Sequence, residues 1–324
     1  MPDQRDTLAL AFERGLASPQ GRWLFLNAAP LPGGVLRDAT CEQPFRADHL
    51  ALAAAGYDTA PAREAEGMDG GALLLGRSRR ENERNLARLW NALRPGGTLV
   101  VAGDKTAGIA PLRKLAGART AIVDTFAKHH ATAFVVHRDG QAWPVPEAVR
   151  EADGFAVPVG GFSADGPDPA SRLLARHLDG RPLGRTADLG AGWGYLAREA
   201  LARADVRGLA MFEADHVALE AARANVPQAE AHWHDVALEP IRGPYDSVVM
   251  NPPFHAGSGG RGRASRPGLG QSFIERAGAI LRPGGRLLMV ANRNLPYERT
   301  LAERFRSWSP LADEGGFKVL EGIR

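Results

Sequence analysis

The chain has 324 residues, of which 44% are hydrophobic and 24% charged, with a formal net charge of +3 and a pI of about 9.3. These values are typical of a globular protein, and the length favours two domains because single hydrophobic cores rarely exceed about 250–300 residues. No apolar run approaches the roughly 20 residues that a membrane helix needs, and no basic segment precedes an apolar core near the first residues. The single Cys41 excludes an internal disulfide and a cysteine-clustered zinc site. We therefore expect a cytoplasmic protein.

Apolar stretches in the first half predict strands at Trp23 to Ala28 and at Gly71 to Gly76. The segment Leu86 to Gly103, LARLWNALRPGGTLVVAG, predicts an amphipathic helix, a Pro-Gly turn and an apolar strand. The same pattern returns at Phe273 to Ala291, FIERAGAILRPGGRLLMVA. This echo predicts that the chain holds two copies of one α/β fold.

The first copy lacks the residues that would carry chemistry at its strand ends. APLPGG follows its first strand without a glycine triplet after an acid, and RSRRENE follows its later strand. We interpret residues 1–155 as a degenerate domain that binds RNA or supports residues 156–324, with prolines and glycines between Gln141 and Gly161 marking the boundary. A solvated arginine loop is one interpretation of its arginines, and phosphate binding is the other. These are Arg77, Arg79, Arg80 and Arg84.

The second copy begins with the string DLGAGWGYLA, Asp188 to Ala197, in which an apolar strand ends in a glycine turn. Such a turn lets the backbone approach a nucleoside cofactor, although alone it is also compatible with a dehydrogenase or an inactive fold. The next two predicted strands end at Glu213 and Asp235. Because the carboxyl ends of parallel strands meet in one crevice, Glu213 would hold the ribose hydroxyls and Asp235 the adenine amino group.

A further strand runs into DSVVMNPPFH, Asp246 to His255. An exocyclic or amide nitrogen is a poor nucleophile because its lone pair is delocalised, so acceptors must hold its two hydrogens. The side-chain oxygen of Asn251 and the carbonyl of Pro252 can accept them, and neither Pro252 nor Pro253 has an N–H that competes. Phe254 offers a face on which a flat base can stack. The string therefore predicts methyl transfer from S-adenosylmethionine to a planar nitrogen.

The second half resembles the bacterial ribosomal small-subunit RNA guanine-N2 methyltransferase family, whose catalytic half is a class I S-adenosylmethionine-dependent methyltransferase. The resemblance covers Gly160 to Arg324 and rests on GGFSADGPDPASRLLARHL, DLGAGWGYLA, NPPFH and the tail VANRNLPYERTLAERF with GGFKVLEGIR. The middle strings are shared with many amino-methylating enzymes, and their combination with this tail is more specific. The resemblance implies tandem Rossmann-like methyltransferase domains, the first one degenerate, and methylation of the N2 of a guanosine in 16S rRNA.

The resemblance also implies roles for individual residues. The methionine side of the cofactor would be lined by Asp188, Gly190, Gly192 and Gly194, and its nucleoside side by Glu213 and Asp235. Phe162 and Asp168 would close over the cofactor, or else form a structural turn before a helix. Asn251 to Phe254 would hold the guanine. The loop AGSGGRGRASRPGLG departs from the family by its glycines and arginines, and its candidates for RNA binding are His255, Arg261, Arg263 and Arg266.

No metal is expected. His232 and His234 share one face of a predicted strand, but two ligands are too few for a zinc site. Three alternatives to the leading function remain: a large-subunit rRNA guanine-N2 methyltransferase, a protein glutamine-amide methyltransferase, and a non-catalytic ribosome-assembly factor. Two fused copies make a pseudo-dimer within one chain, so we expect a monomer.

Overall fold

The computed structural model describes residues 3–161, 163, 165–253 and 267–324, and its contacts divide the chain into two units. The first unit spans residues 1–148 and the second residues 149–324. The expected boundary between residues 155 and 156 falls inside strand β9 (Phe155–Pro158), which pairs with β8 (Val149–Ala152) within the second unit. The segment read as a linker therefore contains a β-hairpin.

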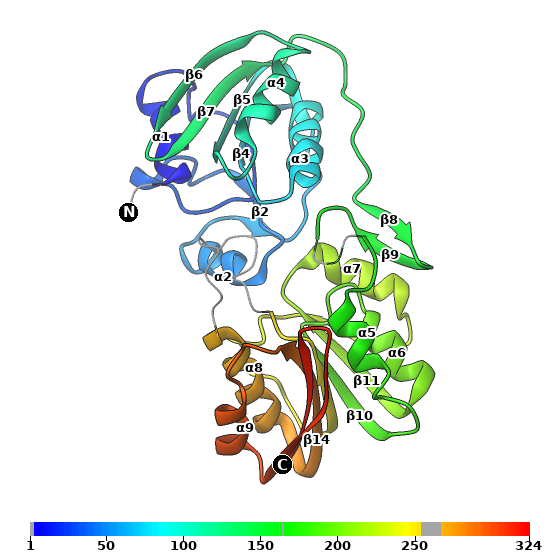
Figure 1. Cartoon of the computed structure of the whole chain (residues 1–324). Helices are drawn as coiled ribbons and strands as arrows, with labels where there is room; N and C mark the ends of the chain where they lie inside the picture. Colours follow the sequence, from blue (N-terminus) through cyan, green and yellow to red (C-terminus); the bar gives the residue numbers. More distant parts are fainter. Residues whose placement is uncertain (1–2, 162, 164, 254–266) are drawn as a thin grey trace. The chain divides into compact units, whose positions relative to one another are not determined.

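The first unit is built around one seven-stranded sheet (Figure 1). Its elements in chain order are α1 (Gln4–Glu13), β1 (Trp23–Leu26), the short 3-10 helix Pro32–Gly34, β2 (Thr40–Glu42), α2 (Arg46–Ala54), β3 (Thr59–Ala60), β4 (Met68–Leu74), α3 (Arg79–Ala92), β5 (Leu93–Asp104), α4 (Ile109–Gly117), β6 (Ile122–Lys128) and β7 (Ala131–His137). The Pro-Gly turn of the predicted helix, turn and strand lies inside β5, so this strand begins earlier than expected.

The second unit follows the same plan after its β8–β9 hairpin. Its remaining elements are α5 (Pro169–Ala175), β10 (Pro182–Leu189), α6 (Tyr195–Arg203), β11 (Asp205–Glu213), α7 (His216–Asn225), β12 (Glu230–Trp233), β13 (Tyr245–Met250), α8 (Pro267–Ile280), β14 (Leu281–Asn292), α9 (Glu298–Arg304), β15 (Ser307–Glu314) and β16 (Phe317–Ile323).

The two large sheets have the same strand order. The first runs β3-β2-β1-β4-β5-β7-β6 and the second β12-β11-β10-β13-β14-β16-β15. In each sheet the first five strands are parallel and the last two pairings are antiparallel. This equivalence confirms the prediction of two copies of one α/β fold.

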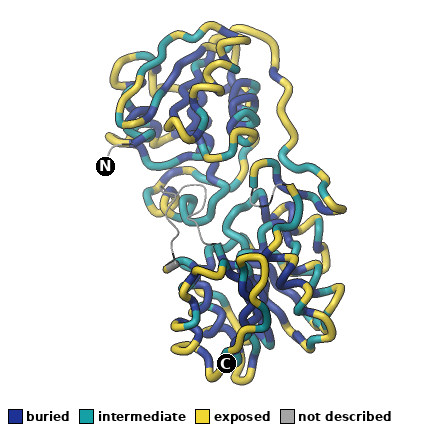
Figure 2. The backbone as a smooth tube through the Cα atoms, viewed as in Figure 1, coloured by how far each residue is buried: buried dark blue, intermediate teal, exposed yellow. Residues whose placement is uncertain are grey.

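Both faces of the second sheet are covered by helices, as its apolar strands require. Side chains alternate along β13: Val249 packs with residues of α5 and α6, whereas Val248 and Met250 pack with residues of α8 and α9. Figure 1 shows α5, α6 and α7 on one side of this sheet and α8 and α9 on the other. The central strands β10, β13 and β14 are accordingly among the most buried parts of the unit, whereas the edge strands β12 and β15 are partly exposed (Figure 2).

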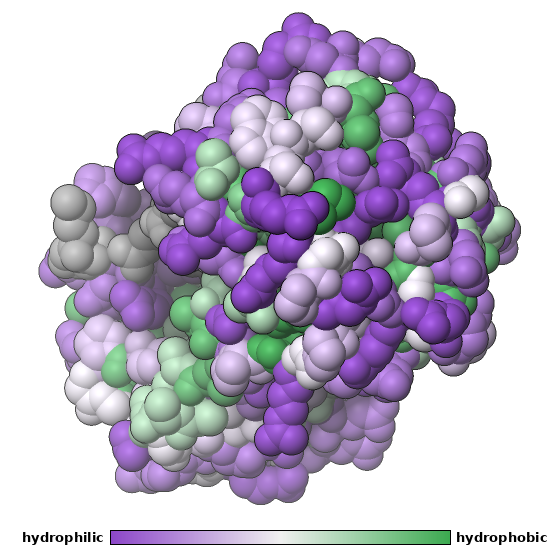
Figure 3. All heavy atoms as spheres, turned by 90° about the horizontal axis from the view of Figure 1, so that it is seen from below, coloured by the Kyte–Doolittle hydropathy of each residue, from purple (hydrophilic) through white to green (hydrophobic). Residues whose placement is uncertain are grey.

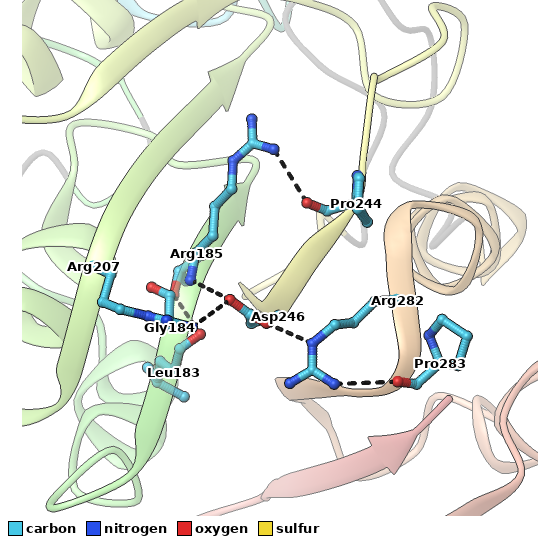
Figure 4. Close-up of polar contacts among 9 residues, drawn as sticks. Leu183, Gly184, Arg185, Arg207, Pro244, Asp246, Arg282 and Pro283 are labelled. Carbon is cyan, nitrogen blue, oxygen red and sulfur yellow. Dashed lines mark hydrogen bonds and ion pairs between the residues drawn. The ribbon is translucent and has the colours of Figure 1, made fainter.

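At the amino end of β13, Asp246 ties three segments of the sheet together (Figure 4). Its carboxylate accepts a hydrogen bond from the backbone N–H of Arg185 at 2.8 Å and from Nε of Arg282 at 2.5 Å, and Arg207 lies 3.2 Å away. A Cβ on Gly184 would lie 2.4 Å from the carboxylate, so this position requires glycine. One carboxylate thus links the starts of β10, β13 and β14, and its ion pair with Arg207 adds β11.

The first unit repeats this arrangement with different residues. Asp69, the second residue of β4, accepts from the backbone N–H of Arg22 at 2.8 Å and from Nε of Arg94 at 2.7 Å. A Cβ on Gly21 would lie 2.6 Å from the Asp69 carboxylate. In this common clamp, the arginine of the repeated Leu-Arg-Pro-Gly-Gly sequence has an equivalent aspartate as its partner in both units.

The described surface carries few large apolar side chains. Among the described residues, only Val123, Val145 and Leu238 are exposed large hydrophobics. The face drawn in Figure 3 is correspondingly mostly hydrophilic, with apolar residues in small patches. None of the helices in the described ranges is long and apolar enough to cross a membrane.

Replacing Asp246 by Asn should lower the free energy of unfolding by roughly 1 kcal/mol near neutral pH, after allowance for solvent screening. The hydrogen bond from the Arg185 backbone and the contact with Arg282 hold the pKa of Asp246 below its usual range. That stabilisation is present above the unfolded pKa of about 3.9 and is lost as pH falls through the lower folded pKa. Urea unfolding at several pH values should therefore show that Asp246→Asn is less stable than the wild type, by a difference that shrinks below about pH 4. Asp205→Asn, a change at an exposed residue, serves as the control. A loss of stability in Asp246→Asn that is the same at every pH would contradict this account.

Candidate active site

The glycine turn and the Asn-Pro-Pro string lie side by side at the centre of the second sheet. The turn follows β10 and the string follows β13, and these two strands pair in parallel. From β10 the chain proceeds outward through β11 and β12, then returns to β13 and continues through β14 on the other side. The strand order therefore reverses between β10 and β13, which is where open α/β sheets bind their ligands.

The three glycines of the turn adopt left-handed backbone conformations, with φ of 74° at Gly190, 57° at Gly192 and 89° at Gly194. A Cβ at Gly190 would lie 3.1 Å from the ring of Phe273, and one at Gly194 would lie 3.1 Å from Val226. At Gly192 a Cβ would meet nothing within 4 Å among the described residues. Packing thus explains two of the glycines, and the middle one borders open space that a ligand can approach.

Glu213 ends β11 beside this turn. Its carboxylate accepts hydrogen bonds from the backbone N–H groups of Gly192 and Asp215, both at 2.8 Å. Burial raises the pKa of Glu213 to about 7, against the opposing effect of these backbone donors. Since a carboxylate offers about four acceptor positions, Glu213 retains acceptor capacity for a ligand hydroxyl group beyond its backbone donors.

Asp188 lies beneath the turn, near the end of β10. It is fully buried, and neither of its carboxylate oxygens accepts a hydrogen bond of ordinary geometry in the described part of the chain, although the backbone N–H of Ala197 lies near them. Burial raises the pKa of Asp188 to about 7; the Ala197 backbone N–H opposes the rise, and the charge of Glu213 adds to it. Buried acids without partners are rare in cores, and their perturbed pKa values are typical of functional sites.

Asp235 lies two residues beyond β12 and organises a tight turn. Its Oδ1 accepts hydrogen bonds from the backbone N–H groups of Ala237 at 2.9 Å and Leu238 at 3.0 Å. Its own N–H donates to a carboxylate oxygen of Glu239 at 3.0 Å. One carboxylate oxygen is thus committed to the turn, and contact with adenine stays a prediction for the other.

Asn251 follows β13 directly, and its amide is held from one side by α5. The Nδ2 group donates to Oγ of Ser171 at 3.0 Å and lies 3.4 and 3.5 Å from the two carboxylate oxygens of Asp168. Asp168 is the N-cap of α5 and accepts from the backbone N–H groups of Ala170 and Ser171. Asp168 thus begins a helix, which is the structural role that the sequence allowed for it, and it also contacts Asn251. Ser171 was not anticipated, since a serine inside a short helix carries no distinctive sequence signal.

The described parts of the site meet around Gly190. The position of its missing Cβ is 3.1 Å from Phe273 of α8 and 4.0 Å from Cδ of Pro253. Six predicted residues lie outside the described ranges: Phe162, Phe254, His255, Arg261, Arg263 and Arg266. Their expected roles in cofactor closure, base stacking and RNA binding therefore stay predictions.

The β8–β9 hairpin supports the glycine turn through Asn225, the last residue of α7. The Asn225 side chain accepts from the Ala156 N–H at 2.8 Å and donates to the Ala156 and Trp193 carbonyl oxygens at 2.8 and 2.7 Å. The rings of Phe155 and Trp193 meet edge to face with centroids 4.9 Å apart. The sequence could not reveal this contact, because its partners are about 30 or more residues apart.

In the first unit the acid that corresponds to Glu213 is already engaged. Glu42 ends β2 and forms two hydrogen bonds with the guanidinium of Arg88, at 2.6 and 2.7 Å. It also accepts from the Arg63 backbone N–H at 2.7 Å. Glu42 is buried, so it has little capacity left for a nucleoside.

Two of the arginines and one of the histidines singled out in the sequence have local partners. Arg79 pairs with Glu83 at 2.7 Å, and Arg84 donates to the Pro146 carbonyl at 3.2 Å. Phe212 stacks on His232 with ring centroids 4.7 Å apart. Within the described ranges, no group of three or more His, Cys, Asp or Glu residues could hold a metal ion.

Comparisons with known proteins identify similar methyltransferases. The methyltransferase small domain family model matches residues 154–321. Ribosomal RNA small subunit methyltransferase C of Chromohalobacter salexigens is 31% identical over 95% of this chain and 92% of its own length. The protein of the same name from Idiomarina loihiensis is 30% identical over 78% of this chain and 77% of its own length.

A solved structure extends the likeness to the whole chain. The T. thermophilus 16S rRNA N2 G1207 methyltransferase (RsmC), in complex with AdoMet and guanosine, superposes with a TM-score of 0.80 and 27% identity. The match covers 99% of this chain and 91% of the T. thermophilus chain, so both units take part in it. The chain therefore belongs to the ribosomal RNA small subunit methyltransferase C family, and its second unit carries the methyltransferase small domain.

Proposed function

We propose that this protein transfers a methyl group from S-adenosylmethionine to the exocyclic N2 of a guanosine in 16S rRNA. The observation that carries the proposal is the adjacency of the glycine turn after β10 and the Asn-Pro-Pro string after β13. The first suits a nucleoside cofactor and the second a planar amino group. The names of its full-length relatives supply the class of substrate.

The residues around the turn fit the cofactor. Open space at Gly192 admits ligand atoms close to the backbone, and Glu213 has acceptor capacity for a ribose hydroxyl. Asp188 would place negative charge beneath the sulfonium and amino groups of the methionine part. Asp235 would hold the adenine amino group. S-adenosylmethionine supplies the electrophilic methyl group when bound.

The residues of the string would orient the target. The Asn251 side-chain oxygen and the Pro252 carbonyl accept the two hydrogens of the guanine amino group, and Phe254 stacks on the base. With the nitrogen aligned toward the methyl group, most of the acceleration comes from proximity and orientation. The cationic product then loses a proton without a strong base. The target base would have to leave its helix or loop to enter the site. The RNA around it would be contacted by His255, Arg261, Arg263 and Arg266.

Three aspects of the assignment, the location, the oligomeric state and the role of the first unit, are finer than the family itself. We place the protein in the cytoplasm as a monomer, with the first unit gripping RNA or supporting the second. Large-subunit rRNA and a protein glutamine amide are the alternative targets, since both offer a planar nitrogen. A non-catalytic assembly role is the third alternative, which Asn251 and the glycine turn disfavour.

The proposal is tested by methyl transfer from labelled S-adenosylmethionine to small subunits, large subunits and total protein from a strain that lacks the enzyme. Nucleoside analysis should recover N2-methylguanosine from small-subunit RNA. Nuclease digestion of the substrate should abolish the transfer, whereas protease digestion should not. Label in large-subunit RNA would indicate a large-subunit rRNA methyltransferase, and label in glutamine would indicate a protein methyltransferase. The absence of label from every fraction would indicate a non-catalytic role.

Replacing Asn251 by Ala should lower turnover by about 10²–10³, because an oriented acceptor of the amino group is lost. The affinity for S-adenosylmethionine should stay within about twofold, since the residue lies on the target side of the site. Calorimetric titration of the cofactor and steady-state kinetics on small subunits measure the two effects separately. A parallel fall in both would contradict the division into cofactor and target sides.

The pKa of Asp188 predicts opposite pH effects on stability and on cofactor binding. Its folded pKa of about 7 lies above the unfolded value of about 3.9, so the wild type loses stability relative to Asp188→Asn as pH rises from about 4 to about 7. Ionised Asp188 attracts a cationic ligand, so wild-type affinity for S-adenosylmethionine should rise through about pH 7. Unfolding and binding curves of both proteins test this. Glu213 is present in the wild type and in Asp188→Asn, so its titration affects both proteins. If stability and affinity change with pH in the same way in the two proteins, Asp188 does not have this role.

A further inference from the structure

The amide of Asn251 is held in one of its two possible orientations by the start of α5. Its Nδ2 carries two hydrogens, and both acceptors around it, Ser171 Oγ and the Asp168 carboxylate, belong to α5 or its N-cap. No described residue donates a hydrogen bond to the Asn251 Oδ1 atom. The amide therefore presents its donor to the protein.

We propose that Ser171 and Asp168 are positioning residues, which orient Asn251 so that its carbonyl oxygen accepts from the target amino group. This inference rests on the proposed function. An asparagine amide can rotate by half a turn, and the rotated form would present N–H groups to the N–H groups of the target. Rotation would also place Oδ1 against the Asp168 carboxylate, where two acceptors repel. Asp168 thus disfavours the unproductive orientation.

The support is rigid because it is built into the core of the second unit. Ser171 is buried, and the next residues of α5, Leu173 and Leu174, are also buried. They belong to the same apolar cluster as Val249 of β13, which lies two residues before Asn251. A single packed cluster therefore carries both the amide and the groups that orient it.

Asp168 also has an electrostatic effect on the reaction. The target nitrogen gains positive charge as it bonds to the methyl group, and its hydrogens then bind more strongly to an acceptor. Polarisation by the nearby carboxylate raises the negative charge on Asn251 Oδ1, because consecutive hydrogen bonds strengthen one another. The gain is larger in the transition state than in the ground state, so it acts on turnover.

Two substitutions test the positioning role without removing α5. Asp168→Asn keeps a good N-cap, because asparagine caps helices about as well as aspartate, but it loses the charge. Ser171→Ala removes only the acceptor hydroxyl and favours the helix. Each should lower the turnover number about tenfold, which corresponds to the loss of one hydrogen bond. Turnover is measured on the substrate that the wild type methylates in the labelling experiment. The melting temperature of both variants, and the affinity of Ser171→Ala for S-adenosylmethionine, should remain at the wild-type values.

A double-mutant cycle with Asn251→Ala separates positioning from a general structural effect. Once the amide is absent, Ser171→Ala and Asp168→Asn should cause no further loss of turnover. Asp3→Asn, a change at the N-cap of α1 in the first unit, is the matched control and should leave turnover unchanged. Wild-type turnover in both single variants would overturn the inference, and so would equal losses with and without Asn251.

The same series distinguishes failure of this inference from failure of the proposed function. If the wild type methylates a protein amide instead of rRNA, the cycle is measured on that substrate, and the positioning role is judged independently. If the wild type methylates no substrate, the proposed function fails, and the orienting role of Ser171 and Asp168 fails with it. If the wild type methylates rRNA and the variants match it, only the positioning role is wrong.

Discussion

The parallel pairing of β10 with β13 is the constraint on which the site depends. It brings the carboxyl ends of two strands together, and the chain changes direction in the sheet between them. The glycine turn follows β10, and Asn251 follows β13. Because both strands are buried on both faces, neither can shift without disrupting the packing of α5 or α8. The distance between cofactor and target is thus fixed by the core.

The first unit shows what remains when the same sheet no longer carries this chemistry. The Asp69 clamp reproduces the Asp246 clamp, so the structural residues of the duplicated fold are retained. At the carboxyl ends, however, Glu42 is paired with Arg88 instead of facing open space. An internal ion pair satisfies the acid that a ligand would otherwise engage. Loss of the site and preservation of the fold are therefore separable, because they depend on opposite ends of the strands.

Stability and function oppose one another beneath the glycine turn. A fully buried carboxylate without a hydrogen bond of ordinary geometry lowers stability whenever it is ionised. Burial raises the pKa of Asp188 and of Glu213 to about 7, and a cationic ligand beside these acids would favour their ionised forms. The β8–β9 hairpin and Asn225 offset part of this cost by holding the turn in place. Ligand affinity and resistance to unfolding are consequently linked through the same acids.

The sequence by itself determined the class of fold, the duplication, and the location of the glycine turn, Glu213 and Asn251, because these features depend on local periodicity and on backbone conformations that favour glycine. It placed Asp168 near the cofactor but did not show its contact with Asn251, and it gave no sign of Ser171 or Asn225. Those partners are separated from the groups they hold by about 30 to 80 residues. Only the tertiary structure decided which polar atoms meet and which way the Asn251 amide faces, because hydrogen-bond partners are chosen by packing across the sheet.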